Sequence, residues 1–290
     1  MKKRNAMRIL YVFVLTAFLS SLHVYAYEKD ASSIVYVSRT GEKYHYVENC
    51  SGMKNPIQMT LLEAINRGRT PCKDCVHEYV EQVGGFTDVY SILTPHSEDI
   101  NWLANTGVSQ GWTEQDGSRT FRPFVNVARC DMAAFIRKLA SNNNWMDAAT
   151  WKPSEADWKA FVDVDPSTPH AEDVLWLAHS EISEGWDIGS GKKEFRPYVS
   201  VARCDMAAFL YRLASKAGVS DAATWSPTES DWAFTDVNTG SSHVKEVLWL
   251  AHSGVSKGWV ESDGTKTFRP LQNVARCDMA AFLHRLNDLH

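Results

Sequence analysis

Apolar residues recur along the second half of the chain with the period of an α-helix. Met132, Phe135 and Ile136 occupy positions i, i+3 and i+4 of one such pattern, and Leu139 extends it to i+7. Residues 206–213 repeat the stripe with the same spacing. Each stripe predicts an amphipathic helix whose apolar face packs against a core.

A shorter helix is predicted ahead of the first stripe. It is expected to begin near Thr94 and Pro95, a capping residue followed by a proline suited to the first helical position, and to end by Gly107. Residues 116–117 read Asp-Gly and Pro123 follows, so the segment between the two helices is predicted as a turn-rich loop. The unit therefore reads helix, loop, helix.

This unit occurs three times. Each copy carries Phe-x-Asp-Val, then Gly-Trp, then Phe-Arg-Pro, and the last motif begins at Phe121, Phe195 and Phe268, at spacings of 74 and 73 residues. The predicted repeats are residues 85–140, 160–214 and 233–288. One helix pair buries little apolar surface alone, so the three are expected to pack on one another as a pseudo-threefold bundle. The predicted fold class is mainly α.

Composition and charge exclude several functional classes. The chain has 290 residues, of which 44% are hydrophobic, and its formal net charge is −5. It lacks the basic excess that binding to duplex nucleic acid requires, so no duplex partner is expected for the repeats. It contains no His-Glu-x-x-His, no Gly-x-Ser-x-Gly and no phosphate loop. The sequence therefore predicts a protein that is not an enzyme.

The first residues have the features of a secretory signal. Basic residues precede an apolar run at residues 9–22, and Val24-Tyr25-Ala26 provides small residues where a signal peptidase cleaves. The run is shorter than the ~20 residues that span a bilayer, which disfavours the alternative of a retained anchor. Residues 1–26 are thus predicted to be removed, leaving a secreted chain without a membrane contact.

Cysteine and histidine cluster ahead of the repeats at spacings typical of a metal site. His45 is followed by Cys50, and Cys72 and Cys75 form a Cys-x-x-Cys knuckle. One histidine and three cysteines satisfy a closed tetrahedral zinc site, and a segment of about 50 residues needs such a staple. Two alternatives stay open: a Cys72–Cys75 disulfide with Cys50 free, and His77 in place of His45.

The three repeats resemble S-layer homology modules, which come in threes and attach secreted proteins to bacterial cell-wall polymers. The resemblance covers residues 85–288 and rests on Phe-x-Asp-Val, Gly-Trp, Phe-Arg-Pro and an arginine that begins the second helix. Where that family commonly has Thr-Arg-Ala-Glu, this chain has Ala-Arg-Cys-Asp at residues 128–131. The resemblance implies non-covalent attachment to a secondary cell-wall polysaccharide or a peptidoglycan-linked polymer at the bacterial cell surface.

The repeated arginines Arg129, Arg203 and Arg276 are candidate ligand-binding residues. The helix dipole disfavours a cation in the first turn, but a guanidinium beside free N-terminal amides could hold an acidic group. The other interpretation is an internal salt bridge to Asp131 or Asp88. The family resemblance implies that this arginine contacts a charged sugar.

Two further repeated positions complete the predicted ligand-binding set. A tryptophan follows each Gly of the Gly-Trp motif, where its indole could stack on a sugar ring and donate its N–H, or instead cap the core. An aspartate lies two residues after each arginine. The tryptophans are Trp112, Trp186 and Trp259, and the aspartates are Asp131, Asp205 and Asp278.

Repeated cysteines and histidines are predicted to be structural. The cysteines occupy one helix position per repeat and are expected to be small buried thiols rather than disulfides. The histidines are expected to form a hydrogen bond near the start of the first helix. These residues are Cys130, Cys204 and Cys277, and His96, His170 and His243.

The cysteine module also resembles the zinc-binding domain of the Ada DNA-repair protein. The resemblance covers residues 33–80 and is carried by Tyr-His, Cys, Leu-x-Glu-Ala and Pro-Cys-x-x-Cys. It implies a small α+β module with one structural zinc ion on His45, Cys50, Cys72 and Cys75, the histidine replacing that domain's first cysteine. Some relatives contact DNA, although the basic residues here form only a mildly basic face.

Together these features predict a non-catalytic secreted protein that binds the cell wall through three modules and presents a zinc module. Two alternatives belong to other classes. The zinc module could capture extracellular DNA, or the protein could be a secreted zinc hydrolase. The second alternative needs an open coordination position, which four protein ligands do not leave.

Overall fold

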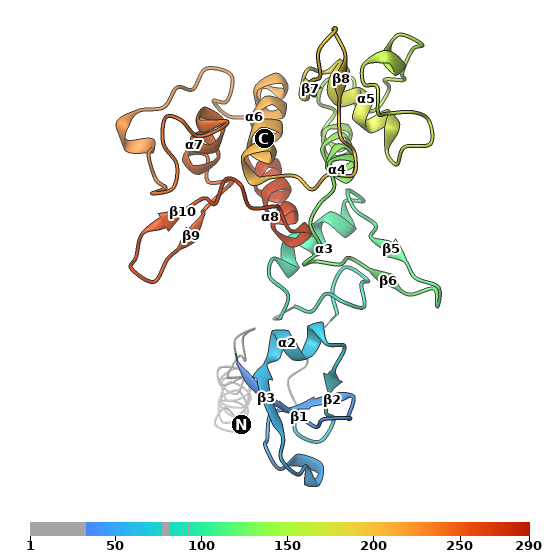
Figure 1. Cartoon of the computed structure of the whole chain (residues 1–290), viewed down its shortest axis with the longest axis vertical. Coiled ribbons are helices and arrows are strands. Elements are labelled where there is room, and N and C mark those ends of the chain that lie inside the picture. Colours follow the sequence, from blue (N-terminus) through green and yellow to red (C-terminus); the bar gives the residue numbers. More distant parts are fainter. Residues whose placement is uncertain (1–32, 77–81, 92) are drawn as a thin grey trace, which may run out of the picture. The chain divides into compact units, whose positions relative to one another are not determined.

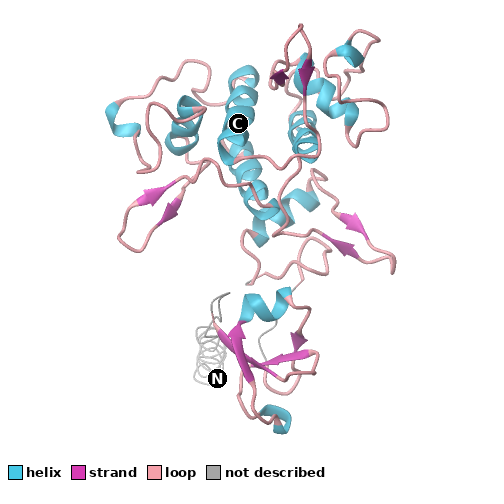
Figure 2. Ribbon diagram, in the orientation of Figure 1, coloured by secondary structure: helices cyan, strands magenta, loops and turns pink. Residues whose placement is uncertain are grey.

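The computed structural model describes residues 33–76, 82–91 and 93–290. The chain divides after Glu81 into two compact units, shown in Figures 1 and 2. The predicted signal sequence and His77 lie outside the described residues. Within the described part, no helix combines the length and the apolar character needed to cross a membrane.

A four-stranded sheet forms the first unit, in the order β3-β1-β2-β4. Its strands are β1 (Ile34–Val37), β2 (Lys43–His45), β3 (Ile57–Thr60) and β4 (Thr70–Pro71), with a short 3-10 turn at Cys50–Gly52. Strand β1 pairs antiparallel with β2 and β3, and β2 pairs parallel with β4. Val35 and Val37 are fully buried because alternate residues of β1 face the core.

Helix α2 (Leu61–Asn66) packs on this sheet. Thr60 caps it, since its side-chain oxygen accepts the N–H of Glu63 at 3.1 Å. Leu61 and Ala64 are fully buried beneath the helix. The resulting core is small, as expected for a unit of this length.

Each repeat of the second unit contains a helix, a two-stranded hairpin and a longer helix. The first helices are α3 (Ser97–Asn105), α5 (Ala171–His179) and α7 (Val244–His252). The hairpins are β5 (Trp112–Thr113) with β6 (Arg119–Thr120), β7 (Trp186–Asp187) with β8 (Lys193–Glu194), and β9 (Trp259–Val260) with β10 (Lys266–Thr267). The longer helices are α4 (Arg129–Asn142), α6 (Arg203–Ala217) and α8 (Arg276–Asn287), and short 3-10 turns lie at Asp157–Lys159 and Glu229–Asp231.

The predicted mainly-α class is wrong, because the described residues form an α+β mixture of seven α-helices and ten strands in four small sheets. The predicted inter-helix loops are in fact hairpins, which project from the longer helices in Figure 2. In the first, Glu114 N–H donates to Ser118 at 2.8 Å, and Gly117 provides the positive φ of the turn. Strands of two residues are too short to show an alternation of polar and apolar positions in the sequence.

The helices pack between consecutive repeats rather than within one. Helix α4 packs on α5, α6 on α7, and α8 on α3. Aromatic contacts lie at these interfaces: Tyr211 meets Trp249 edge-on at 5.5 Å, and Trp102 stacks on His284 at 4.5 Å. The last repeat therefore contacts the first, and the core of the unit is shared among all three.

A ring of backbone hydrogen bonds joins the segments that precede the longer helices. Val127 N–H donates to Val274, Val201 N–H to Val127, and Val274 N–H to Val201, each at 2.9 Å. All three valines are fully buried. The ring fixes the starting points of α4, α6 and α8 relative to one another.

The first helix of a repeat starts slightly later than predicted. Helix α3 begins at Ser97, after His96 in a left-handed conformation with φ 61°. Thr94 does not cap it; its side-chain oxygen instead accepts the N–H of Tyr90 at 2.9 Å. The threonine predicted as the helix cap therefore stabilises the turn before the helix instead.

Candidate metal centre and ligand pockets

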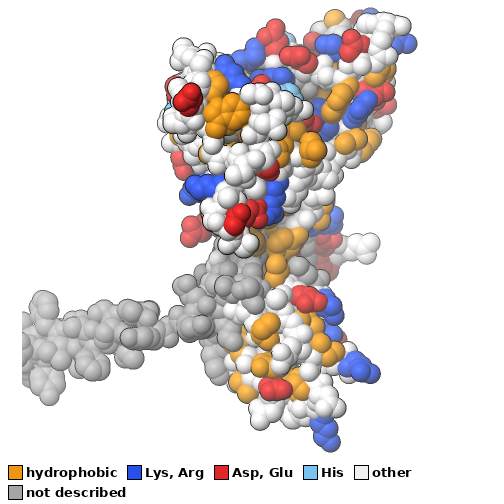
Figure 3. Space-filling view, turned by 60° about the vertical axis from the view of Figure 1, so that its left-hand side comes forward, with side chains coloured by type: hydrophobic (Ala, Val, Ile, Leu, Met, Phe, Trp, Pro, Cys, Tyr) orange, Lys and Arg blue, Asp and Glu red, His pale blue; other side chains and the backbone are white. Residues whose placement is uncertain are grey.

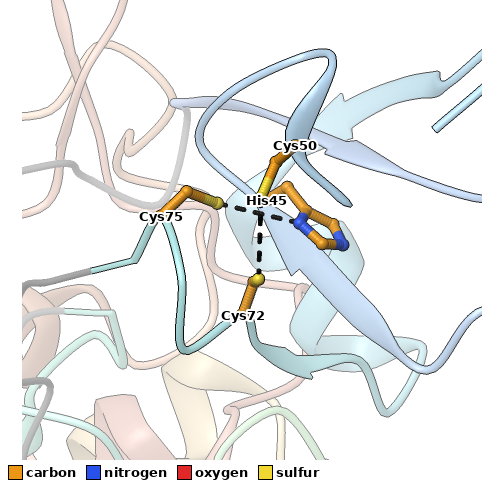
Figure 4. Close-up of side chains that lie close together, drawn as sticks. All are labelled: His45, Cys50, Cys72 and Cys75. Atoms are coloured by element: carbon orange, nitrogen blue, oxygen red, sulfur yellow. Dashed lines mark hydrogen bonds between the residues drawn. The ribbon is translucent and has the colours of Figure 1, made fainter. Parts of the chain in front are cut away.

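His45, Cys50, Cys72 and Cys75 converge on one point in the first unit (Figure 4). Their ligand atoms all lie within 4.8 Å of one another. Cys50 Sγ is 3.8 Å from Cys72 Sγ, and Cys75 Sγ is 3.7 Å from His45 Nδ1. Tetrahedral ligands at zinc distances are separated by roughly 3.5–3.8 Å, so the spacing fits a metal ion.

The sheet explains why these residues meet. Parallel pairing of β2 with β4 sets Tyr44 beside Pro71, so that the next residues, His45 and Cys72, emerge at the same end. The N–H of Cys72 donates to Tyr44 at 3.0 Å. A turn closed by Val76 N–H on the Cys72 carbonyl, also at 3.0 Å, brings the second cysteine of the knuckle back to the site.

The protonation preferences of two residues of the cluster, His45 and Cys72, suit a metal ion. Burial, aided by the positive charge of Lys43, lowers the pKa of His45 and favours the neutral imidazole that coordinates metals. Burial raises the pKa of Cys72, but hydrogen bonds from the backbone N–H groups of Asp74 and Cys75 and from the Cys50 thiol outweigh it, and the pKa is lowered overall. All six described cysteines are free thiols, which excludes the Cys72–Cys75 disulfide from this structure.

Three pockets in the second unit have the same construction, and each draws residues from all three repeats. They have volumes of about 170, 240 and 260 Å³. Each is lined by a tryptophan, an aspartate, a phenylalanine, an arginine from the preceding repeat and a histidine from the following one. In order these are Trp186, Asp205, Phe209, Arg129 and His243; Trp112, Asp131, Phe135, Arg276 and His170; and Trp259, Asp278, Phe282, Arg203 and His96.

Each pocket arginine is buried and contacts a carbonyl, a carboxylate and a tryptophan ring. Arg129 is 3% exposed, and its Nε donates to the Phe195 carbonyl at 2.8 Å. Its guanidinium lies 3.6 Å from Asp205 and 4.0 Å from the ring centre of Trp186. Burial lowers the pKa of the arginine to about 10, and Asp205 acts in the opposite direction, so it stays protonated at neutral pH.

The same contacts recur at the other two arginines. Arg203 donates to Phe268 and approaches Asp278 and Trp259, while Arg276 donates to Phe121 and approaches Asp131 and Trp112. Each arginine therefore pairs with the aspartate of a neighbouring repeat, rather than with an acidic residue of its own repeat. The sequence could not reveal this because the partner is about 75 residues distant or more.

The first amides of the long helices are not free, contrary to expectation. The N–H of Arg129 donates to Val199 and that of Cys130 to Pro197, each at 3.0 Å. Equivalent bonds join Arg203 and Cys204 to the third repeat, and Arg276 and Cys277 to the first. The helix N-termini thus hold the neighbouring loop, and a ligand in the pocket would be bound by side chains.

The aspartate of the Phe-x-Asp-Val motif shapes the loop beside the pocket. Asp88 accepts the N–H groups of Phe121 and Arg122, both at 2.7 Å. Arg122 has φ 57°, a conformation that is unfavourable for a residue with a side chain. These charge-assisted bonds stabilise it, which gives Asp88 a structural role. The ion pair of Arg276 is formed with Asp131, and Asp88 acts on this arginine only as a more distant negative charge.

The glycine of the Gly-Trp motif is required because neighbouring atoms lie too close to its Cα for a side chain to fit. A Cβ at Gly185 would lie 2.7 Å from the Glu194 carbonyl and 2.5 Å from the Phe161 ring. Trp186 beside it is half-buried and has two guanidinium groups over its ring, Arg129 at 4.0 Å and Arg196 at 4.7 Å. The indole ring thus packs against two arginines. Within the described residues, its N–H has no hydrogen-bond acceptor.

Sequence reasoning missed the histidines as pocket residues. His243 is the residue just before α7, yet its Nε2 lies 3.7 Å from Asp205 of the preceding repeat, and its side chain lines that repeat's pocket. His96 and His170 lie equivalently at Asp278 and Asp131. The recurrence of a histidine at the same position in every repeat could have indicated a shared role. The pocket itself could not be predicted, because the aspartate that each histidine faces lies in another repeat.

Serines line the same pockets and were not predicted. The hydroxyl oxygens of Ser183 and Ser256 are buried without a hydrogen-bond partner among the described residues. Ser109, at the equivalent position, accepts the Gly111 N–H at 3.4 Å. Each serine lies two residues before the motif glycine, so the unpaired hydroxyls belong to the same repeated construction.

The repeated cysteines are buried thiols, each at most 3% exposed. Burial, followed by the negative charge of the adjacent aspartate, raises the pKa of Cys130 and Cys204 to about 11 and that of Cys277 to about 12. The unfolded chain would therefore release these protons first, near pH 9. The stabilising effect of the protonated thiols is present below that pH and is lost as the pH rises to about 11.

We accordingly expect the second unit to lose about 2 kcal/mol of unfolding free energy per thiol between pH 9 and 11. Urea unfolding followed by tryptophan fluorescence at both pH values measures this loss. A variant with Cys130, Cys204 and Cys277 all replaced by Ala should show a smaller loss. An equal loss in that variant would assign the alkaline sensitivity to other groups.

The face of the molecule in Figure 3 bears on nucleic-acid binding. Its Lys and Arg side chains are interspersed with Asp and Glu side chains and do not gather into one basic area. Such a mixed surface lacks the continuous positive potential that tracks a phosphate backbone.

The chain has a distant similarity to a known protein. No family model matches the sequence. A cellulosome-anchoring protein of Acetivibrio thermocellus is 24% identical over 194 residues, which cover 66% of this chain and 38% of that protein. The chain thus spans well under half the length of that relative. It is distantly similar to part of a protein that anchors cellulosomes.

Proposed function

We propose that this is a non-catalytic, secreted protein that attaches non-covalently to bacterial cell-wall polysaccharide through three pockets. The observation that supports this proposal best is the threefold recurrence of one pocket, in which a buried arginine lies against a half-buried tryptophan and an aspartate. The distant similarity to a cellulosome-anchoring protein supports a surface-anchoring role. The motif resemblance to S-layer homology modules points to the wall polymer as partner.

The size and lining of the pockets suit sugar recognition. Their volumes of about 170–260 Å³ lie below the ~300 Å³ at which pockets for drug-sized ligands begin, so each would take one terminal sugar residue. The indole N–H, the serine hydroxyl and the histidine are directional partners for sugar hydroxyls. The buried arginine orders the tryptophan and adds positive potential.

We further propose that the first unit holds one structural zinc ion. Three cysteines and one histidine prefer zinc among common metals, and four protein ligands fill a tetrahedral site. A filled site leaves no position for the activated water that a hydrolase needs. The zinc module is then the domain that the wall-bound repeats present.

Binding to isolated walls tests the anchoring proposal. The protein without residues 1–26 should sediment with purified cell walls, and acid extraction of the secondary polymers should reduce the bound amount at least about tenfold, as loss of a multivalent interaction does. Equal binding to extracted and intact walls would contradict the proposal.

A matched pair of variants locates the binding surface. Replacing Trp112, Trp186 and Trp259 together with Phe keeps aromatic packing but removes the indole donors, and should weaken sedimentation. Trp145→Phe is the control, since Trp145 is buried outside the three pockets. Comparable loss in both variants would indicate general destabilisation rather than lost ligand contacts.

A further inference from the structure

The three pockets differ at the residue just before the motif Gly-Trp. This residue lines its pocket in every case and is exposed at the rim. It is neutral in the first repeat, Gln110, acidic in the second, Glu184, and basic in the third, Lys257. One equivalent position therefore carries three different charges.

A second rim position also differs. The residue nine positions after the helix arginine is Arg212 in the second repeat and Arg285 in the third, and both line their pockets. They donate to the carbonyls of Ile182 at 3.1 Å and Val255 at 3.2 Å. The first repeat has Lys138 here, which lines a neighbouring hollow rather than the Trp112 pocket.

These differences give the pockets different net charges. In the Trp186 pocket two arginines face two carboxylates, and in the Trp112 pocket one arginine faces one carboxylate. The Trp259 pocket has three cations against one carboxylate. Its charged lining residues are Arg203, Lys257, Arg285 and Asp278. If the one histidine in each pocket is left out of the count, the charges balance in the Trp186 and Trp112 pockets. The Trp259 pocket has an excess of two positive charges.

We propose that the Trp259 pocket selects a sugar bearing a carboxylate or phosphate, whereas the Trp186 and Trp112 pockets favour uncharged sugars. This inference rests on the proposed binding of wall polysaccharide. Arg285 and Lys257 provide the charge excess at the rim, since Arg203 is already engaged with Phe268 and Asp278. In the Trp186 pocket Glu184 repels an anion at the position where Lys257 attracts one.

The two rim residues permit a charge exchange that leaves the fold undisturbed. Glu184 and Lys257 form no ion pair within the described residues, and both are exposed. The double variant E184K/K257E keeps the net charge of the protein unchanged. It moves the positive excess from the Trp259 pocket to the Trp186 pocket, so the preference for an anionic sugar should move with it.

Fluorine NMR of the protein labelled with 5-fluorotryptophan reads each pocket separately. Single Trp→Phe variants assign the resonances of Trp112, Trp186 and Trp259, and the labelled chain is titrated with glucuronic acid, glucose 6-phosphate and glucose. Both acidic sugars should shift the Trp259 resonance at about fivefold lower concentration than the other two, a difference typical of one or two exposed charges. Glucose should show no such preference.

The outcomes separate this inference from the proposed function. Transfer of the anion preference to Trp186 in E184K/K257E supports the inference. Equal responses of the three tryptophans to the acidic sugars, or a preference unchanged by the exchange, would overturn it while wall binding stands. If no pocket resonance responds to any sugar and the protein does not sediment with walls, the proposed function fails as well.

Discussion

Treatment with a chelator, which would remove the proposed zinc ion, is expected to unfold the first unit and to leave the second folded. Structural zinc contributes about 10–16 kcal/mol of apparent binding free energy in small modules, more than a core as small as this one can replace. The unit would therefore depend on the cluster of His45 and three cysteines. Amide NMR signals from β1 and β2 should collapse to unfolded positions.

The distribution of tryptophan supplies an internal control for this experiment. All eleven tryptophans lie between residues 102 and 259, in the second unit. Tryptophan fluorescence should therefore stay constant while the first unit unfolds. Zinc added back in stoichiometric amount should restore the amide signals, and the variant Cys50→Ser with Cys72→Ser should resemble the chelated protein. Retention of the β1 and β2 signals after complete chelation would contradict a structural metal.

Replacing Arg203 by Lys is expected to lower the unfolding free energy of the second unit by about 2–3 kcal/mol. A lysine cannot donate to the Phe268 carbonyl, approach Asp278 and lie flat on Trp259 at the same time, as the guanidinium does. The lost bonds leave a buried carbonyl unpaired. Denaturant unfolding followed by tryptophan fluorescence measures the change.

Arg269→Lys provides the matched control. Arg269 lies over the same Trp259 ring at 4.5 Å, but it is 40% exposed and pairs with Glu261 at the surface. Its replacement should cost less than about 1 kcal/mol. Equal small effects at both arginines would show that Arg203 does not link the repeats, and Arg129 and Arg276 would then need the same reappraisal.

The metal cluster could be predicted from sequence because its chemistry is local. Cys72 and Cys75 form one turn, and the only distant step, from Cys50 to Cys72, spans a single small unit. Few combinations of thiol and imidazole exist in so short a segment. The geometry agrees with the ligand set that the spacing suggested.

The repeat pockets show where sequence reasoning ends. Periodicity located the long helices and the burial of their apolar faces, but the two-residue strands of the hairpins have no period to detect. The partner of each arginine and histidine lies in another repeat, and nothing in one repeat indicates which neighbour it faces. An internal salt bridge is one of the two predicted roles of the arginine, but its partner is an aspartate of a neighbouring repeat and not Asp131 or Asp88 of the same repeat.

The contacts of the pocket arginines link the three repeats in a closed ring. Arg129 binds the second repeat, Arg203 the third, and Arg276 returns to the first. Stacked arrays that stay open can gain or lose a copy, because each added unit needs only one neighbour. Here every copy already has both neighbours. A gene duplication that added one repeat would produce a repeat with no free neighbour to pack against. We therefore expect related proteins to gain repeats in whole sets of three.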